Sequence, residues 1–245
     1  TLKVYGSLTL ASAMLWNFSG SNRDILFEST NTGETITCAG KQLGDLFFNG
    51  IGGVWTLTDS LSGYYIYHNN GTFITNNQPL NCYSFNASSA NPSGLYLGTS
   101  VITCGYSWNT SYNNTLTLDA DSSLIIFGLG SMDVGPNQIY NDAIFTSNGY
   151  IMADSAIFNN VTFKNSGSIY DYSWFGVSGN YFKNVLFQST GTISTLNSNY
   201  GKVEFQNGNA SISGNNTFDT LFFNNPGNVV TLRNGDTTTI TGNLI

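Results

Sequence analysis

A short phrase recurs along this chain and constrains its fold more than any other feature. The phrase has an aromatic or aliphatic residue, two mostly polar positions, an apolar-x-Phe triplet, a polar turn with glycine, and then Ile or Val. The clearest copies span residues 158–169, 182–193 and 218–229, and weaker ones begin at Tyr140, Tyr200, Leu43 and Asp24. Such internal repetition predicts a repeat architecture in which each copy is one structural unit.

The last phenylalanine of the phrase returns at a nearly constant interval. It stands at positions 27 and 48 near the start of the chain, and at positions 145, 163, 187, 205 and 223 further on. An interval of about 18–24 residues per coil suits one turn of a β-solenoid, because its turns vary in length while its strands stay aligned. Leucine-rich repeats have a similar period, but this chain lacks their regular Leu–Asn pattern.

Each phrase also alternates as a strand does. In Val185-Leu186-Phe187, residues 185 and 187 point to one side and residue 186 to the other. Stacked phrases then place Phe above Phe at the strand spacing of about 4.8 Å. Asn-rich turns fit, because Asn tolerates left-handed backbone angles and forms side-chain ladders between coils, while glycine supplies sharp corners.

The predicted fold is therefore all-β, a right-handed parallel β-helix (β-solenoid) that forms one continuous domain over residues 1–245. Both ends of the chain lie within repeating material, as in a fragment of a longer repeat protein.

Composition excludes several function classes. Charged residues make up 9 % of the chain, the net charge is −7, and the seven Lys and Arg are scattered. Nucleic-acid binding by phosphate neutralisation is therefore not expected. No apolar run approaches the roughly 18 residues of a membrane span, so we expect no membrane insertion within this segment, and no signal peptide is visible.

The sequence offers little catalytic chemistry. It contains no nucleophile elbow, P-loop or dinucleotide-binding motif. His68 is the only histidine, so a zinc pair or a typical triad cannot form within the chain, and we interpret it as a surface or hydrogen-bonded residue. Asp154 and Asp171 are isolated in sequence, although stacking of coils could bring carboxylates together. We expect no enzymatic activity.

One pair of carboxylates needs separate treatment. Asp119 and Asp121 are separated by a single residue and would share a face of an extended strand. We favour a turn between two strands here. A calcium site and an acid–base pair are the alternatives, and this calcium ion is the one cofactor considered.

The chain has three cysteines, Cys38, Cys82 and Cys104. A low and odd number of cysteines does not indicate a disulfide scaffold. We interpret them as small buried residues. The separation of Cys82 and Cys104 corresponds to one coil of the repeat, so a disulfide between stacked coils stays an open alternative.

Clustered aromatic residues are the best lead to a ligand, because exposed rings can stack on sugars or dock a partner. The alternative is that these rings pack or cap the coils. Phe175 is followed by glycine within the longest interval of the repeat, between Phe163 and Phe187, which predicts a loop extruded from the solenoid. The candidate contact residues are Tyr65, Tyr67, Tyr170, Tyr172, Trp174 and Phe175.

Several phrases resemble the repeat regions of very large secreted surface proteins and adhesins of bacteria, Bacteroidota among them. The resemblance rests on residues 43–57, 70–77, 109–127, 214–223 and 237–243. It implies a secreted β-helix spacer or adhesive stalk and carries over no catalytic residue.

The leading hypothesis is a structural and adhesive module of an extracellular bacterial surface protein, acting as a rigid stalk that contacts surface glycans or other proteins. The alternative is a carbohydrate-binding or carbohydrate-cleaving β-helix. Ice binding is a third hypothesis, although the Thr-x-Thr pairs are too irregular for an ice-binding ladder and β-propensity accounts for them.

Overall fold

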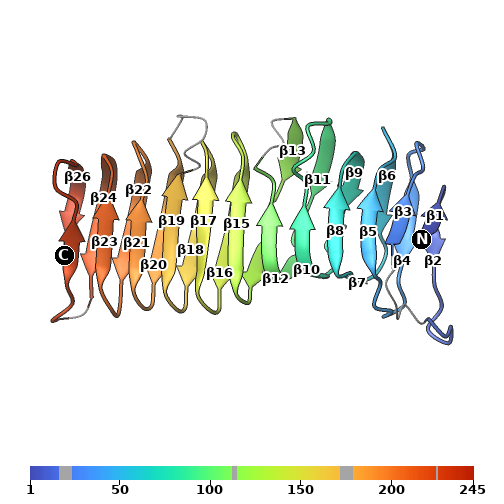
Figure 1. Cartoon of the computed structure of the whole chain (residues 1–245), viewed down its shortest axis with the longest axis horizontal. Coiled ribbons are helices and arrows are strands. Elements are labelled where there is room, and N and C mark those ends of the chain that lie inside the picture. Colours follow the sequence, from blue (N-terminus) through green and yellow to red (C-terminus); the bar gives the residue numbers. More distant parts are fainter. Residues whose placement is uncertain (17–23, 112–114, 172–178, 225) are drawn as a thin grey trace. The chain divides into compact units, whose positions relative to one another are not determined.

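The computed structural model describes residues 1–16, 24–111, 115–171, 179–224 and 226–245, and no helix occurs among these residues. The chain divides into two compact units, residues 1–125 and 126–245. Within each unit, strands from successive coils lie side by side and pair in parallel (Figure 1). The predicted parallel β-solenoid is thus confirmed for each unit, and one continuous domain over residues 1–245 stays a prediction.

Unit 1 contains two parallel ladders, and each coil contributes a strand to both. The first ladder consists of β1 (Leu2–Val4), β3 (Asp24–Phe27), β5 (Asp45–Phe48), β7 (Leu61–Ser62), β8 (Tyr65–His68), β10 (Leu80–Asn86) and β12 (Val101–Asn109). The second consists of β2 (Leu8–Thr9), β4 (Glu34–Thr37), β6 (Val54–Leu57), β9 (Gly71–Ile74), β11 (Ser93–Tyr96) and β13 (Leu116–Asp119).

Unit 2 repeats this plan with longer strands in its first ladder. That ladder consists of β14 (Leu124–Phe127), whose last two residues belong to unit 2, then β16 (Ile139–Phe145), β18 (Ile157–Phe163), β20 (Tyr181–Phe187), β22 (Asn199–Phe205), β24 (Asn216–Phe223) and β26 (Thr238–Leu244). The second consists of β15 (Gly130–Val134), β17 (Gly149–Ala153), β19 (Gly167–Asp171), β21 (Gly191–Ser194), β23 (Ala210–Ser213) and β25 (Val230–Leu232).

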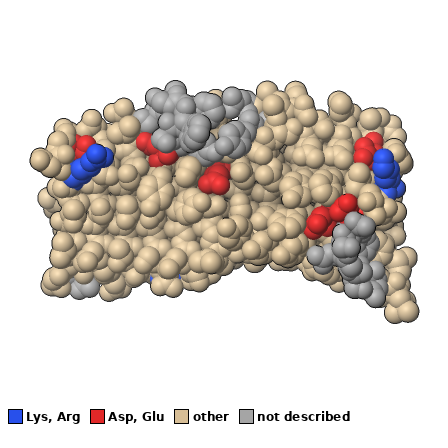
Figure 2. Space-filling view, viewed as in Figure 1, with Lys and Arg blue, Asp and Glu red and all other residues tan. Residues whose placement is uncertain are grey.

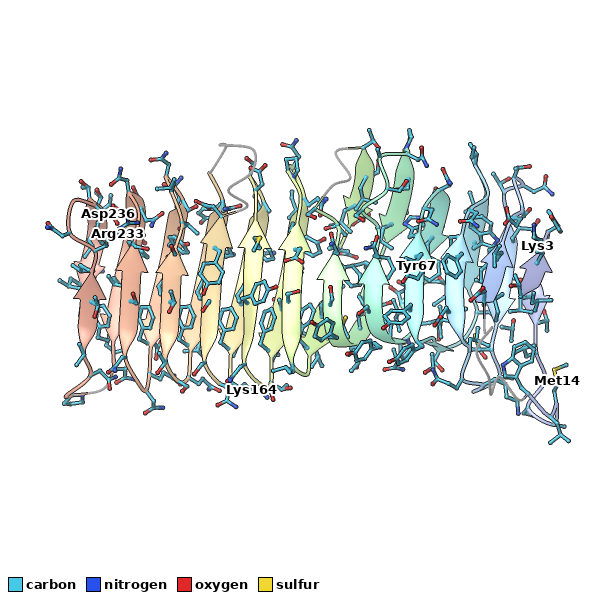
Figure 3. The ribbon with its side chains drawn as sticks, in the orientation of Figure 1. Lys3, Met14, Tyr67, Lys164, Arg233 and Asp236 are labelled. Atoms are coloured by element: carbon cyan, nitrogen blue, oxygen red, sulfur yellow. The ribbon has the colours of Figure 1, made fainter. Side chains whose placement is uncertain are left out.

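Columns of stacked rings form the core of unit 2, as the spacing of phenylalanines predicts. Phe145, Phe163, Phe187, Phe205 and Phe223 are register partners across successive coils. Their ring centroids are 4.8, 5.0, 4.8 and 5.5 Å apart in that order, with nearly parallel planes. Figure 3 shows rings repeated from coil to coil. The longer sequence interval from Phe163 to Phe187 therefore leaves the stack of these two rings intact.

Asparagine acts in the turns and between coils as expected. Asn76, Asn77, Asn137 and Asn197 have positive φ angles between 52° and 62°. Amide ladders also join coils on the surface: Asn184 donates to Asn160 (2.9 Å), and Asn160 donates to Asp142 (2.6 Å). Uncharged side chains thus supply inter-coil hydrogen bonds in a chain that is poor in charged residues.

Three glycines of unit 2 have a different role from the one predicted. Gly149, Gly167 and Gly191 begin successive strands of the second ladder, and none of them has a positive φ. A Cβ on Gly167 would lie 2.1 Å from the Phe163 ring, and one on Gly191 would lie 2.5 Å from the Phe187 ring. These glycines make room for the phenylalanine column, whereas the sequence interpretation assigned glycines to corners.

Candidate functional site

The outward face of the first ladder in unit 1 carries two columns of side chains that change character between β8 and β10. In one column, Phe47 of β5 pairs with Tyr67 of β8, and the next position is Asn86 of β10. The rings of Phe47 and Tyr67 stack at 4.7 Å with an interplanar angle of 12°. Asn86 continues no ring stack, so the second face of the Tyr67 ring borders space above β10.

The neighbouring column changes in the same coil. Tyr65 of β8 pairs with Ser84 of β10, and Ser84 pairs with Ser107 of β12. In both columns a tyrosine of β8 is thus followed by a small polar residue of β10. The result is a hollow of about 400 Å³, lined by Tyr65, Ile66, Tyr67, Tyr83, Ser84, Phe85, Asn86, Tyr106 and Ser107. We call it the tyrosine hollow.

Tyr83 and Tyr106, which line this hollow, belong to a stack of three tyrosines. Tyr83 stacks on Tyr64 at 5.0 Å and on Tyr106 at 5.4 Å, with interplanar angles of 11° and 4°. Tyr65 stands across this stack and meets Tyr83 edge-on, at 5.8 Å and 85°. Tyr65 is also hydrogen-bonded to Tyr64, and the rings of Tyr65 and Tyr67 both line the hollow.

The tyrosine hollow is polar but uncharged. None of the described residues that line it is a Lys, Arg, Asp or Glu. The nearest acidic influence is Asp45, since the pKa of Tyr67 is raised first by partial burial and then by the Asp45 carboxylate. Burial and the neighbouring Tyr64 raise the pKa of Tyr65 as well. Both phenols thus stay protonated and able to donate hydrogen bonds at neutral pH. Figure 2 shows how sparsely charged groups are distributed over the face it presents.

Of the second predicted cluster, only Tyr170 lies among the described residues. Tyr172, Trp174 and Phe175 lie outside the described residues, and with them the predicted extruded loop. Tyr170 of β19 is half-buried and meets Tyr150 edge-on at 6.1 Å. It lines a second hollow of about 320 Å³ together with Asp171, Ser194, Thr195, Leu196, Ser213, Gly214 and Arg233. The structure thus brings Tyr65 and Tyr67 into one site and places Tyr170 at another, in the other unit.

Asp171 is the carboxylate in that second hollow, and two protein donors hold it. Asn180 donates to one oxygen at 3.0 Å, and the amide of Leu196 donates to the other. Burial raises the pKa of Asp171 to about 6, against the lowering effect of these hydrogen bonds. Asp154, which adds to the rise, does not line the hollow. Because both oxygens of this carboxylate accept hydrogen bonds from other parts of the chain, Asp171 links neighbouring segments of the solenoid.

Asp119 and Asp121 lie at a turn after β13. Asp119 ends β13, and its carboxylate accepts a hydrogen bond from the Asp121 amide at 3.2 Å, while Asp121 has a φ of 36° and accepts from Ser122. This confirms the favoured turn. Among the residues that the structure describes, no group of three or more His, Cys, Asp or Glu could hold a metal ion.

The sequence left two alternatives for His68, a surface residue or a hydrogen-bonded one. His68 is buried and hydrogen-bonded, so the surface alternative is wrong. It ends β8 and is the register partner of Phe48, so it occupies a position of the inner phenylalanine column. Its Nε2 lies 3.2 Å from the Gly71 carbonyl, and its Nδ1 is buried without a hydrogen-bond partner. Burial lowers the pKa of His68 to about 4, so the ring is neutral at physiological pH and has no access to a substrate.

The cysteines are buried, as predicted, and all three thiols are free. Cys82 of β10 and Cys104 of β12 are register partners, so their separation in sequence does correspond to one coil. The Thr-x-Thr pairs align over two coils only: Thr35 pairs with Thr56, and Ile74 and Tyr96 take the next positions in that column. No regular threonine ladder results.

Comparison with known proteins returned no match: no family model, no curated protein and no solved structure resembles this chain closely enough. A search of the described residues for a helix long and apolar enough to cross a membrane also found none. Function therefore has to be inferred from the contacts of the described residues.

Sequence reasoning missed Tyr83 and Tyr106 of the tyrosine hollow. The signal was present, because Cys82-Tyr83-Ser84-Phe85 and Cys104-Gly105-Tyr106-Ser107-Trp108 are two versions of one phrase that differ by a single inserted residue. Aligning them stacks Tyr83 on Tyr106 and Phe85 on Trp108, whose rings lie 4.2 Å apart.

Proposed function

We propose that this chain is a structural and adhesive module of an extracellular bacterial surface protein, and that it contacts neutral glycans through the tyrosine hollow. The stacked coils provide a scaffold whose surface is uncharged over most of its area. The observation that carries the proposal is the free face of Tyr67 beside Asn86 and Ser84, at the step from rings to small polar side chains.

The chemistry of the hollow favours a sugar over other ligands. A pyranose ring has an apolar face of C–H groups and an equator of hydroxyls. The Tyr67 ring offers a surface for the first, while Ser84, Asn86 and Ser107 offer donors and acceptors for the second. Because no charged side chain lines the hollow, it offers nothing to pair with a uronate or sulfate, and a neutral glycan fits best.

The arrangement of coils adds a reason to expect an extended glycan. Tyr64, Tyr83 and Tyr106 repeat at 5.0 and 5.4 Å along the stack. An extended β-linked polysaccharide advances by a similar distance per sugar. A chain running along the coil axis could therefore present equivalent groups to successive tyrosine hydroxyls, which would make weak contacts cumulative.

Isothermal titration calorimetry with neutral gluco- and manno-oligosaccharides tests the proposal, with an oligogalacturonate as the charged comparison. We expect at least tenfold weaker binding for Tyr67→Ala, equal to about 1.4 kcal/mol. Tyr181→Ala is the control, because Tyr181 is an outward-facing tyrosine, exposed at 41 %, that lies on β20 of unit 2 and does not line the hollow. Equal binding by both variants, or preferred binding of the oligogalacturonate, would refute glycan contact at this hollow.

No enzymatic role is proposed. A single carboxylate, already engaged by two donors, lines the hollow of unit 2 within the part of the chain that the structure describes. Absence of enzymatic activity stays a prediction, and it is checked by assaying release of reducing ends from the same oligosaccharides.

A further inference from the structure

Two cysteines face each other across neighbouring coils beneath the tyrosine hollow. Cys82 of β10 and Cys104 of β12 are direct register partners, and both are buried, with 8 % and 0 % of their surface exposed. Cys38 follows β4 in the second ladder and is separate from this pair. Of the three thiols, these two therefore form a pair.

The parallel register places the two cysteines within reach of a disulfide. Neighbouring strands lie about 4.7–4.9 Å apart, and cysteines joined by a disulfide have Cα atoms about 4.4–6.8 Å apart. The Cβ atoms must also approach to about 3.5–4.5 Å, which requires a small local adjustment.

A bulge beside the pair supplies that freedom. The register shifts between Cys82 and Ser84, because β12 has Gly105 and Tyr106 opposite the single Tyr83 of β10. The regular ladder is interrupted at this point, so the two strands can shift there without breaking a continuous row of hydrogen bonds.

The two sulfurs already interact and are chemically distinct. A hydrogen bond between the two side chains raises the pKa of Cys82 and lowers that of Cys104, and the Cys104 sulfur also lies 3.0 Å from the Ser107 carbonyl. Cys104 is therefore the better nucleophile, whereas Cys82 retains the small exposed area through which a reagent can arrive.

We propose that Cys82 and Cys104 are an oxidation site that closes a disulfide between two coils when the protein meets a low-molecular-weight disulfide. Cys82 attacks the reagent and becomes a mixed disulfide, and one reagent thiol leaves with the Cys82 proton. The Cys104 sulfur then attacks the Cys82 sulfur and releases the second reagent thiol with its own proton. Two protein thiols are oxidised and one reagent disulfide is reduced.

The bond would fasten β10 to β12 beside the bulge and would close a loop from residue 82 to residue 104. Loops of this size give disulfides a substantial stabilising effect. We expect the thermal unfolding midpoint of unit 1 to rise by roughly 5–10 °C on oxidation.

The test uses the natural chain. Reduced protein is incubated folded with oxidised glutathione, denatured, alkylated with iodoacetamide and digested for mass spectrometry. The expected product has a cross-linked 82–104 peptide pair and one alkylated cysteine, Cys38. Cys38→Ala should give the same cross-link, and Cys82→Ala should leave Cys104 free. A parallel sample oxidised in denaturant shows whether the pairing needs the fold.

Three results would overturn the proposal. They are three alkylated cysteines after oxidation, a stable glutathione adduct at Cys82 without cross-link, and cross-links that include Cys38 as often as Cys104. An unchanged unfolding midpoint despite complete cross-linking would refute the stabilisation.

Discussion

Replacing His68 removes one titrating group from the core of unit 1 and isolates its contribution to stability. The folded-state pKa is about 4, against an ordinary value of 6.5. Between these values the unfolded chain binds more protons than the folded one, so the free energy of unfolding falls as the pH falls. The contribution is fully present above pH 6.5 and is lost as the pH decreases through about 4.

The magnitude follows from the size of the shift. A lowering from 6.5 to about 4 corresponds to a loss of roughly 2 kcal/mol between pH 7 and pH 5, and about 3 kcal/mol by pH 4. Carboxylates also titrate in this range, so the wild-type curve alone is not diagnostic. The difference between wild type and a His68 variant cancels them and leaves the histidine.

Two variants separate titration from packing. His68→Phe restores the ring column with Phe48, while His68→Leu fills the position without a ring. The two changes alter packing differently, and overpacking or lost contacts shift stability by about 1–3 kcal/mol at every pH. Both variants nevertheless abolish the protonation effect. Their free energies should therefore differ from wild type by an offset plus the same pH-dependent term.

The assay is urea unfolding at pH 7, 6 and 5, followed by fluorescence of the buried Trp55 and Trp108 of unit 1. Because the chain has one histidine, its Cε1–H resonance in NMR also reports the folded pKa without ambiguity. Parallel pH profiles for wild type and both variants would refute the reasoning. So would a histidine resonance that titrates near its ordinary pKa of 6.5.

Two further predictions concern unit 2. Burial raises the pKa of Asp171 from 3.8 to about 6, so the folded state binds more protons in this window and stability should rise as the pH falls through it. Asp171→Asn should remove this term, of about 2 kcal/mol after allowance for solvent screening. Chemical unfolding of wild type and the variant at pH 7 and pH 4.5 checks it, and a difference in free energy of unfolding between the two proteins that is the same at both pH values would contradict it. Phe187 is fully buried between Phe163 and Phe205, so Phe187→Asp should cost more than the about 3–5 kcal/mol of a ring-to-alanine change and should unfold adjacent coils. Leu186→Asp, on the outward side of the same strand, is the control. Circular dichroism and hydrogen exchange measure whether each variant folds. A folded Phe187→Asp protein would contradict the placement of Phe187 in the core.

The interval between phenylalanines was enough to predict the coil, because each ring in a stack must lie on the next. Phe163, Phe187 and Phe205 are register partners although their sequence intervals differ. The same counting could have placed His68, which follows Phe48 by one interval of the repeat in an Ile-Tyr-His version of the Leu-Phe-Phe triplet. It was missed because a histidine was judged by its chemistry and not by its place in the repeat.

The tyrosine hollow could not be predicted in the same way. Tyr65 and Tyr67 were identified as a cluster, but the hollow depends on the next coil having Ser84 and Asn86 at the matching positions. That match requires the register of β8 on β10, which pairs Tyr65 with Ser84 and Tyr67 with Asn86, whereas the sequence shows only that the intervals between coils vary. A sequence reveals which residues are aromatic, whereas the free face of a ring is determined by its neighbour across the ladder.

Departures from the repeat are therefore more informative about function than the repeat itself. A ring that continues a column is accounted for by stacking, which favours any ring at that position. A column that stops gives up that stacking energy, so the small residue that ends it needs another explanation. In unit 1 the departures gather between β8 and β12: Asn86 ends the outward column of Phe47 and Tyr67, Ser84 follows Tyr65, and Cys82 and Cys104 lie beside the bulge between β10 and β12. A repeat pattern tends to be broken where a functional site needs a different residue. For this reason we place both the ligand contact and the oxidation site in the three coils that contain β8, β10 and β12.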